Sequence, residues 1–332
     1  MFYDLPMEKP PPASDTAKSP HLGPLATTRG RGAISNRPGR YRGCEHGCVY
    51  CFARTSHALL DLSPGLDFET QLSVKPNAPD LLRKELSRRG YRPRTMAIGT
   101  NTDPYQALEL RERVMRGCLD VLWEFRHPLA ITTKGALIER DLDILAPMAA
   151  EGLVQVGISV TTLDAGLARK MEPRVPSPTR RLKAIERLAR AGVPVRVCAS
   201  PMIPGLTDHE LEAILEAAVG AGAQAASWVM LRLPRDVARL FQEWLEDALP
   251  GQAQKVLKRV REAHGGKDYD PAWHRRLRGQ GLAAELIEKR YQLALKRLSI
   301  SETLPALRCD LFAVPKPASD QLDLFAGPPG EA

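Results

Sequence analysis

The 332-residue chain has few cysteines and no long apolar run, and each shortage excludes a class of protein. Six cysteines are too few for a disulfide-dense secreted domain of this length. No apolar run approaches the ~18 residues that a membrane-spanning helix needs, and the N-terminus, which contains Asp4 and Glu8, is unlike a secretory signal. We therefore expect a cytoplasmic protein without a membrane segment.

The composition is otherwise that of a globular protein, with 43% hydrophobic and 26% charged residues. Lys and Arg number 47 against 39 Asp and Glu, which gives a net charge of +8. Much of the excess lies between residues 255 and 308, where 13 basic residues face 6 acidic ones. A solvated surface accounts for this pattern as well as a polyanionic partner such as nucleic acid does.

Strand and helix patterns alternate along the first two thirds of the chain. The apolar strand at 154–160 and the amphipathic helix at 178–191 are examples, and a strand just before Cys44 brings the count to six repeats. Such repeats predict a parallel sheet with fewer strands than the eight of a closed barrel. An open doubly wound sheet is the alternative, although no G-x-G-x-x-G follows the first strand.

Four segments are expected from these patterns. Residues 1–28 are rich in Pro, Ser and Thr and are predicted to be disordered. Residues 29–232 carry the strand–helix repeats, and residues 233–308 form a basic helical appendage. Residues 309–332 return to Pro, Gly and Ser and are predicted to be a flexible tail.

Three of the six cysteines, Cys44, Cys48 and Cys51, form the spacing C-x3-C-x2-C. Thiolates at this spacing can hold three irons of a [4Fe-4S] cluster and leave the fourth iron open to an exogenous ligand. A zinc site usually has four ligands, and His46 would complete a Cys3His set. A zinc-stabilised binding module is therefore the alternative outside enzymology.

The triplet, the aromatic Tyr50 before its third cysteine, and the strand–helix repeats resemble the radical S-adenosylmethionine (SAM) superfamily. The resemblance implies an α/β fold, a partial (β/α)6 TIM-like barrel with a C-terminal helical appendage. It also implies an enzyme whose [4Fe-4S] cluster, on Cys44, Cys48 and Cys51, reductively cleaves SAM to a 5′-deoxyadenosyl radical. A reductase or flavodoxin-type protein would donate the electron.

Further motifs resemble the bacterial subgroup related to spore photoproduct lyase, often described as DNA-repair-photolyase-like. They lie at residues 42–51, 99–106, 172–174 and 201–205. We therefore expect an enzyme that acts on nucleic acid, in DNA repair or modification. Modification of a protein or a small molecule is the alternative, and whether the reaction is that of a lyase or a transferase stays open.

Polar residues follow the predicted strands, where α/β barrels place their reacting groups. By the resemblance, Tyr50 lies near the adenine of SAM, Thr102 and Asp103 contact its amino group, and Lys134 and Ser159 contact its carboxylate and ribose. Ordinary strand-to-helix turns also select Ser, Thr and Asp. Lys134 is the most informative, because an ammonium group in such a place is costly without an anionic partner.

The chain departs from its relative at one position of catalytic interest. Spore photoproduct lyase has a hydrogen-donating cysteine after the second strand, where this chain has Thr100. Cys198, on a later strand, is a candidate donor, although a small buried core residue is the alternative.

Two arginine groups are candidates for contacts with nucleic acid. Arg174, Arg180 and Arg181 follow the fourth strand, where they could bind phosphates or simply be solvated. A second group at residues 275–278 lies in the basic appendage. Charge alone does not decide between binding and solvation.

The tail contains a short apolar motif. It resembles the bacterial sliding-clamp-binding motif, in which a glutamine, two leucines and a terminal phenylalanine dock into the replication clamp. The residues are Gln321, Leu322, Asp323, Leu324 and Phe325. Folding back onto its own domain is the alternative use of such an apolar segment.

Overall fold

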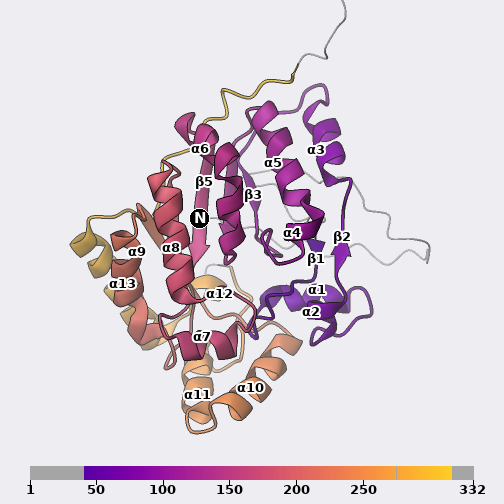
Figure 1. The fold of residues 1–332 in the computed structure, drawn as a ribbon. Helices are drawn as coiled ribbons and strands as arrows, with labels where there is room; N and C mark the ends of the chain where they lie inside the picture. Colours follow the sequence, from indigo (N-terminus) through magenta and orange to yellow (C-terminus); the bar gives the residue numbers. More distant parts are fainter. Residues whose placement is uncertain (1–40, 274, 316–332) are drawn as a thin grey trace, which may run out of the picture.

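A parallel β-sheet forms the centre of the computed structural model, which describes residues 41–273 and 275–315 (Figure 1). Within these residues the sheet has five strands in the order β3-β4-β5-β6-β7. They are β3 (Met96–Ile98), β4 (Leu129–Thr133), β5 (Val154–Ser159), β6 (Val195–Met202) and β7 (Ala225–Met230). The strands are rich in apolar and β-branched residues because both faces of a parallel sheet are buried.

Helices connect the strands and cover the outside of the sheet (Figure 1). The longer ones are α3 (Ala78–Leu86), α5 (Val114–Glu124), α6 (Leu142–Ala150), α8 (Pro178–Arg190), α9 (Leu211–Gly220) and α13 (Gly281–Leu298). Helix α8 begins where its sequence predicts, because the Ser177 side chain accepts a hydrogen bond from the backbone N–H of Arg180 and Pro178 occupies the first turn. The short helix α7 (Ala165–Met171) is likewise capped by Asp164.

The predicted α/β fold with a partial barrel is confirmed, but the strand expected just before Cys44 belongs to a different sheet. β1 (Tyr41–Arg42) pairs antiparallel with β2 (Ser73–Val74) in a separate two-stranded sheet. Because β1 is only two residues long and β2 takes its ladder hydrogen bonds, it does not add a sixth strand to the parallel sheet.

The C-terminal part of the chain packs on the sheet. The Tyr291 hydroxyl of α13 donates to the carbonyl oxygen of Ala226 at 2.8 Å, and the N–H of Ala226 donates to the carbonyl of Ser301 at 3.0 Å. Further on, the ring of Phe312 packs against Phe125, Tyr91 and His127. Leu311 and Phe312, expected in a flexible tail, are therefore part of the packing because their apolar side chains lie against the core.

Two of the sequence predictions lie outside the described residues, namely the disordered segment 1–28 and the motif at 321–325. In the described part of the chain, no helix combines the length and the apolar character that crossing a bilayer requires.

Candidate cofactor site

A cavity of about 150 Å³ lies at the carboxyl ends of the parallel strands. Cys44, Cys48 and Cys51 all line it. The five residues expected to contact SAM line it as well: Tyr50, Thr102, Asp103, Lys134 and Ser159. Residues from the cysteine loop and from three strand ends therefore meet around one space.

The cysteine loop, residues 43–51, is held by backbone contacts from both sides. On one side the N–H of Glu45 donates to Gln106 Oε1 at 2.9 Å, and the Glu45 carboxylate accepts from the N–H of Leu108 at 2.6 Å. On the other side the N–H of Val49 donates to the carbonyl of Met171 at 3.0 Å. The segment after β3 and the end of helix α7 thus fix the position of the cysteines.

Burial controls the protonation of the three thiols. It raises the pKa of Cys44 to about 12, with Asp103 adding to the rise, and it also raises the pKa of Cys48 and of Cys51. Thiolate ligands must lose their protons, so metal loading of this loop releases protons and the metal must supply the stabilising charge. An all-thiolate set lining one cavity fits an iron–sulfur cluster.

The zinc alternative and the iron–sulfur cluster use the same three cysteines and differ in the role of His46. Across residues 41–273 and 275–315, no three His, Cys, Asp or Glu side chains converge on a point where they could hold one metal ion. His46, the expected fourth ligand, is buried with its Nδ1 3.5 Å from Asp103 Oδ2. His46 thus contacts a carboxylate in this structure, and its part in a Cys3His zinc set remains a prediction.

Asp103 joins the ends of β3 and β4. Its Oδ1 accepts from the Thr133 hydroxyl at 2.5 Å and from the N–H of Tyr105 at 2.9 Å, and its Oδ2 accepts from the N–H of Lys134 at 2.7 Å. Thr102 similarly donates to the carbonyl of Tyr41 at 3.2 Å. Both residues therefore hold the cavity wall together, and their contact with an amino group remains a prediction.

Sequence reasoning did not identify the most connected buried carboxylate beside the cavity, Glu172. It accepts hydrogen bonds from the Tyr50 hydroxyl, from Thr161 Oγ1 at 2.8 Å and from Arg181 Nη2 at 2.6 Å. Lys134 Nζ lies 4.0 Å from its Oε1. Glu172 thus supplies the anionic partner that the position of Lys134 requires.

Glu172 is charged despite its burial. Burial alone raises the pKa of its carboxyl group, but Arg181, Lys134 and the hydrogen bonds from Tyr50 and Thr161 outweigh this and hold the pKa below the usual range. The only sequence signal was its motif at 172–174, which does not reveal a partner 122 residues away in the chain.

The arginines considered as candidates for contacts with phosphate pair with carboxylates of this chain. Arg181 is buried against Glu172, Arg180 pairs with Glu139, and Arg174 pairs with Glu69. In the second group, Arg275 lies 3.1 Å from Asp270, and Arg278 lies 3.3 Å from Glu288. Arg276 is buried with its guanidinium over the Trp273 ring. Arg181 and Arg276 are therefore core residues, whereas contact of the partly exposed arginines of both groups with nucleic acid remains a prediction.

Cys198 lies beneath the cofactor cavity. It is 2% exposed and lines a separate small cavity together with Gln155 and Arg196. Thr132 lines both cavities, so the two cavities are neighbours, but Cys198 does not line the first one. Its role as a hydrogen donor remains a prediction.

The helical appendage forms a wall behind the cysteine loop. Helices α10 (Asp236–Ala248) and α11 (Ala253–Ala263) make a hairpin at the bottom of Figure 1. Apolar residues of both helices, including Phe241 and Val256, belong to the cluster that contains Cys48 and Tyr50. The hairpin therefore excludes water from one side of the loop.

Comparison with known proteins agrees with this geometry. The family model of the radical SAM superfamily matches residues 40–218. An uncharacterized protein of Mycobacterium tuberculosis is 40% identical over 256 residues, 76% of this chain and 74% of the relative. An uncharacterized protein of Methanocaldococcus jannaschii is 28% identical over 172 residues, 52% of this chain and 61% of that one.

Among solved structures, spore photoproduct lyase has a similar fold. A variant with bound AdoMet and dinucleoside spore photoproduct has a TM-score of 0.59 and 13% identity, over 86% of this chain and 80% of that one. At this identity the likeness shows the fold alone.

Proposed function

Because the chain belongs to the radical SAM superfamily, we propose that Cys44, Cys48 and Cys51 hold a [4Fe-4S] cluster and that this enzyme cleaves SAM in the adjoining cavity. The observation that carries the proposal is the meeting of these thiols with Lys134 and Ser159 around one space of about 150 Å³. Reduced thiols and an oxygen-sensitive cluster favour a cytoplasmic location.

A [4Fe-4S] cluster held by Cys44, Cys48 and Cys51 would supply, when bound and reduced, the one electron needed for reductive cleavage of SAM. The protein binds and orients the reactant. The ammonium of Lys134 attracts the SAM carboxylate, Ser159 offers a hydroxyl to the ribose, and the Tyr50 ring lines the cavity beside them. The wall formed by α10 and α11 keeps water from the back of the loop.

The substrate class that we propose is nucleic acid. Support comes from the net charge of +8 and from a fold shared with an enzyme solved with a dinucleoside photoproduct. Modification of a protein or a small molecule is the second candidate. Deuterium placed in the candidate substrates distinguishes them, because the 5′-deoxyadenosyl radical abstracts hydrogen from its substrate. The label should enter 5′-deoxyadenosine from DNA or RNA in the first case and from protein or a metabolite in the second.

Anaerobic reconstitution tests the cofactor proposal directly. We expect about four iron and four sulfide per chain, and 5′-deoxyadenosine once a reductant and SAM are added. One zinc without sulfide would contradict the proposal and restore the binding-module alternative.

Partner binding through the segment at 321–325 is a separate proposal that rests on sequence alone. A peptide spanning residues 319–327 should bind the sliding clamp of the same organism with micromolar affinity, since a short docking peptide orders few residues. Changing Leu324 and Phe325 to Ala should remove binding and leave SAM cleavage unchanged. A flavodoxin-type electron donor completes the proposed partners.

A further inference from the structure

Glu172 is the residue through which the cysteine loop, two strand ends and helix α8 contact one another. It directly follows α7 and is 1% exposed. Tyr50 reaches it from between Cys48 and Cys51, and Thr161 reaches it from just beyond β5. Arg181 of α8 binds Glu172 and also donates to the carbonyl of Ser159 at 2.9 Å.

The charges around Glu172 do not balance. One carboxylate faces two cations, Arg181 at 2.6 Å and Lys134 at 4.0 Å. Arg181 is 1% exposed and is held by both Glu172 and the carbonyl of Ser159, whereas Lys134 lines the cavity. Lys134 is therefore the cation that can turn from Glu172 toward an anionic group entering the cavity, without leaving the carboxylate unpaired.

We propose that Glu172 is the positioning residue of this site, which fixes Tyr50 and hence the cysteine loop while it holds Lys134 at the cavity wall. This inference rests on the proposed function. Glu172 does not line the cavity, so it acts through Tyr50 and Lys134 rather than on the reacting atoms.

The chain offers a matched control in Glu210. Its carboxylate accepts from Thr162 Oγ1 at 2.5 Å and from the N–H of Leu163 at 2.6 Å, so it holds the segment that directly follows Thr161. It contacts the same loop as Glu172 without touching Tyr50 or Lys134. Glu210→Gln should therefore reproduce any general loosening of that loop and nothing more.

The first test uses the metal-free protein and measures alkylation of each cysteine by iodoacetamide, followed by mass spectrometry. Glu172→Gln should speed modification of Cys48 and Cys51 about tenfold, because local opening of the loop becomes easier. Cys118, buried in α5, is the internal control and should not change. Tyr50→Phe should also speed alkylation of Cys48 and Cys51 and leave Cys118 unchanged. Because this variant keeps the negative charge of Glu172, the faster alkylation would then come from the loss of positioning and not from a changed charge near the thiols.

The second test uses the reconstituted enzyme. For Glu172→Gln we expect kcat for 5′-deoxyadenosine formation to fall about tenfold, with a change in KM for SAM below about threefold. Glu210→Gln should match the wild type in both constants. Two results would overturn the inference. One is an alkylation rate that Glu172→Gln changes by the same factor at Cys48 and at Cys118. The other is a Glu172→Gln variant whose kcat and KM equal those of Glu210→Gln.

The two proposals fail in different ways. If the wild-type protein binds no cluster and cleaves no SAM, the proposed function is wrong. If the wild type is active and the Glu172→Gln variant matches it, only the positioning role is wrong.

Discussion

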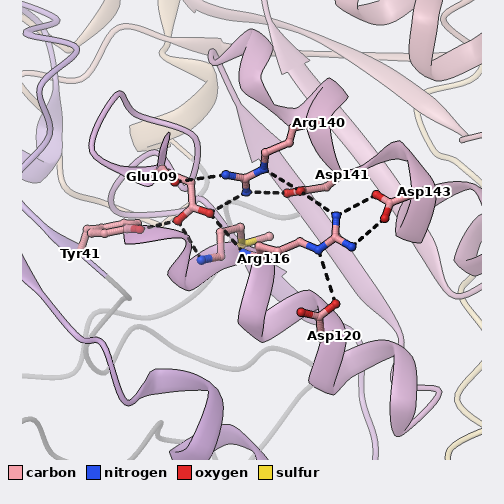
Figure 2. Close-up of polar contacts among 8 residues, drawn as sticks. Tyr41, Glu109, Arg116, Asp120, Arg140, Asp141 and Asp143 are labelled. Atoms are coloured by element: carbon pink, nitrogen blue, oxygen red, sulfur yellow. Dashed lines mark hydrogen bonds and ion pairs between the residues drawn. The ribbon is translucent and has the colours of Figure 1, made fainter. Parts of the chain in front are cut away.

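Two buried glutamates, Glu109 and Glu172, have nearly the same set of partners in two different regions of the molecule. Glu109 accepts from the Tyr41 hydroxyl and from Arg140 Nη2 at 2.7 Å (Figure 2). Glu172 likewise accepts from a tyrosine hydroxyl and an arginine. Both carboxylates are almost completely buried.

The two networks differ in what else they contact. Glu109 also accepts from the backbone N–H of Met115 at 2.9 Å and of Arg116 at 3.2 Å, so it caps the start of α5. Figure 2 shows its neighbours continuing into a chain of ion pairs through Asp141, Arg116 and Asp143. Glu172 instead contacts Tyr50 and Lys134, which line the cavity. A buried ionic network by itself therefore does not indicate function. It does so only where the residues that it binds also line a site, as Tyr50 and Lys134 do.

The largest expected effect compares one cysteine from each region. Cys48→Ala should abolish the cluster and all 5′-deoxyadenosine formation, because the cluster loses one of three ligands. Cys118→Ala, in the helix that Glu109 caps, should keep both and cost on the order of 1 kcal/mol of stability. Iron analysis and product chromatography measure the two outcomes. Full activity in Cys48→Ala would contradict the assignment of Cys48 as a cluster ligand, and the network of Glu172 would then no longer adjoin a functional site.

The next effect compares the two arginines. Arg181→Met should lower the free energy of unfolding by about 3–5 kcal/mol, because it leaves Glu172 buried without its main counter-ion. Arg140→Met should cost less, since Arg140 is 22% exposed and Glu109 keeps its two backbone donors. Urea unfolding at neutral pH gives both values. Equal losses would show that the two networks do not differ in stability.

The smallest expected effect is the pH dependence of the folding stability that the ionised Glu172 carboxylate contributes. The folded-state pKa of Glu172 lies below that of the unfolded chain, near 4.5, since Arg181 and Lys134 outweigh burial. The corresponding stability is fully present above about pH 4.5 and is lost as the pH falls through the folded-state value. Wild-type protein should therefore lose more stability between pH 4.5 and pH 3 than Glu172→Gln does. Parallel urea titrations over this range check it, and identical slopes would contradict it.

The sequence predicted the residues that line the cavity better than the residues that hold them in place through hydrogen bonds and ion pairs. Tyr50 and Lys134 were identified from a motif and a strand end, and the carboxyl ends of parallel strands necessarily share an edge. The partner of Tyr50 could not be predicted in the same way. A hydrogen bond between residues 50 and 172 depends on how two loops meet, which no local pattern encodes.

Arg181 and the α10–α11 hairpin are two further cases in which a local sequence pattern did not predict the tertiary contact. An arginine in the first turn of an amphipathic helix is usually solvated, and only the burial of Glu172 makes it a core residue. The amphipathic patterns of the hairpin predicted an apolar face but did not identify the surface that it covers. The two-residue strand β1 was likewise too short for its pattern to indicate a pairing partner.

The packing of α10 and α11 against the cysteine loop has a consequence for the order of biosynthesis. The loop leaves the ribosome early, whereas the hairpin that covers it is encoded about 200 residues later. At about 5–20 residues per second, roughly 10–40 s separate the two events. Throughout that interval the nascent cysteines lack one wall of their final environment. We therefore expect the proposed cluster to reach these cysteines more easily before the C-terminal helices dock than afterwards.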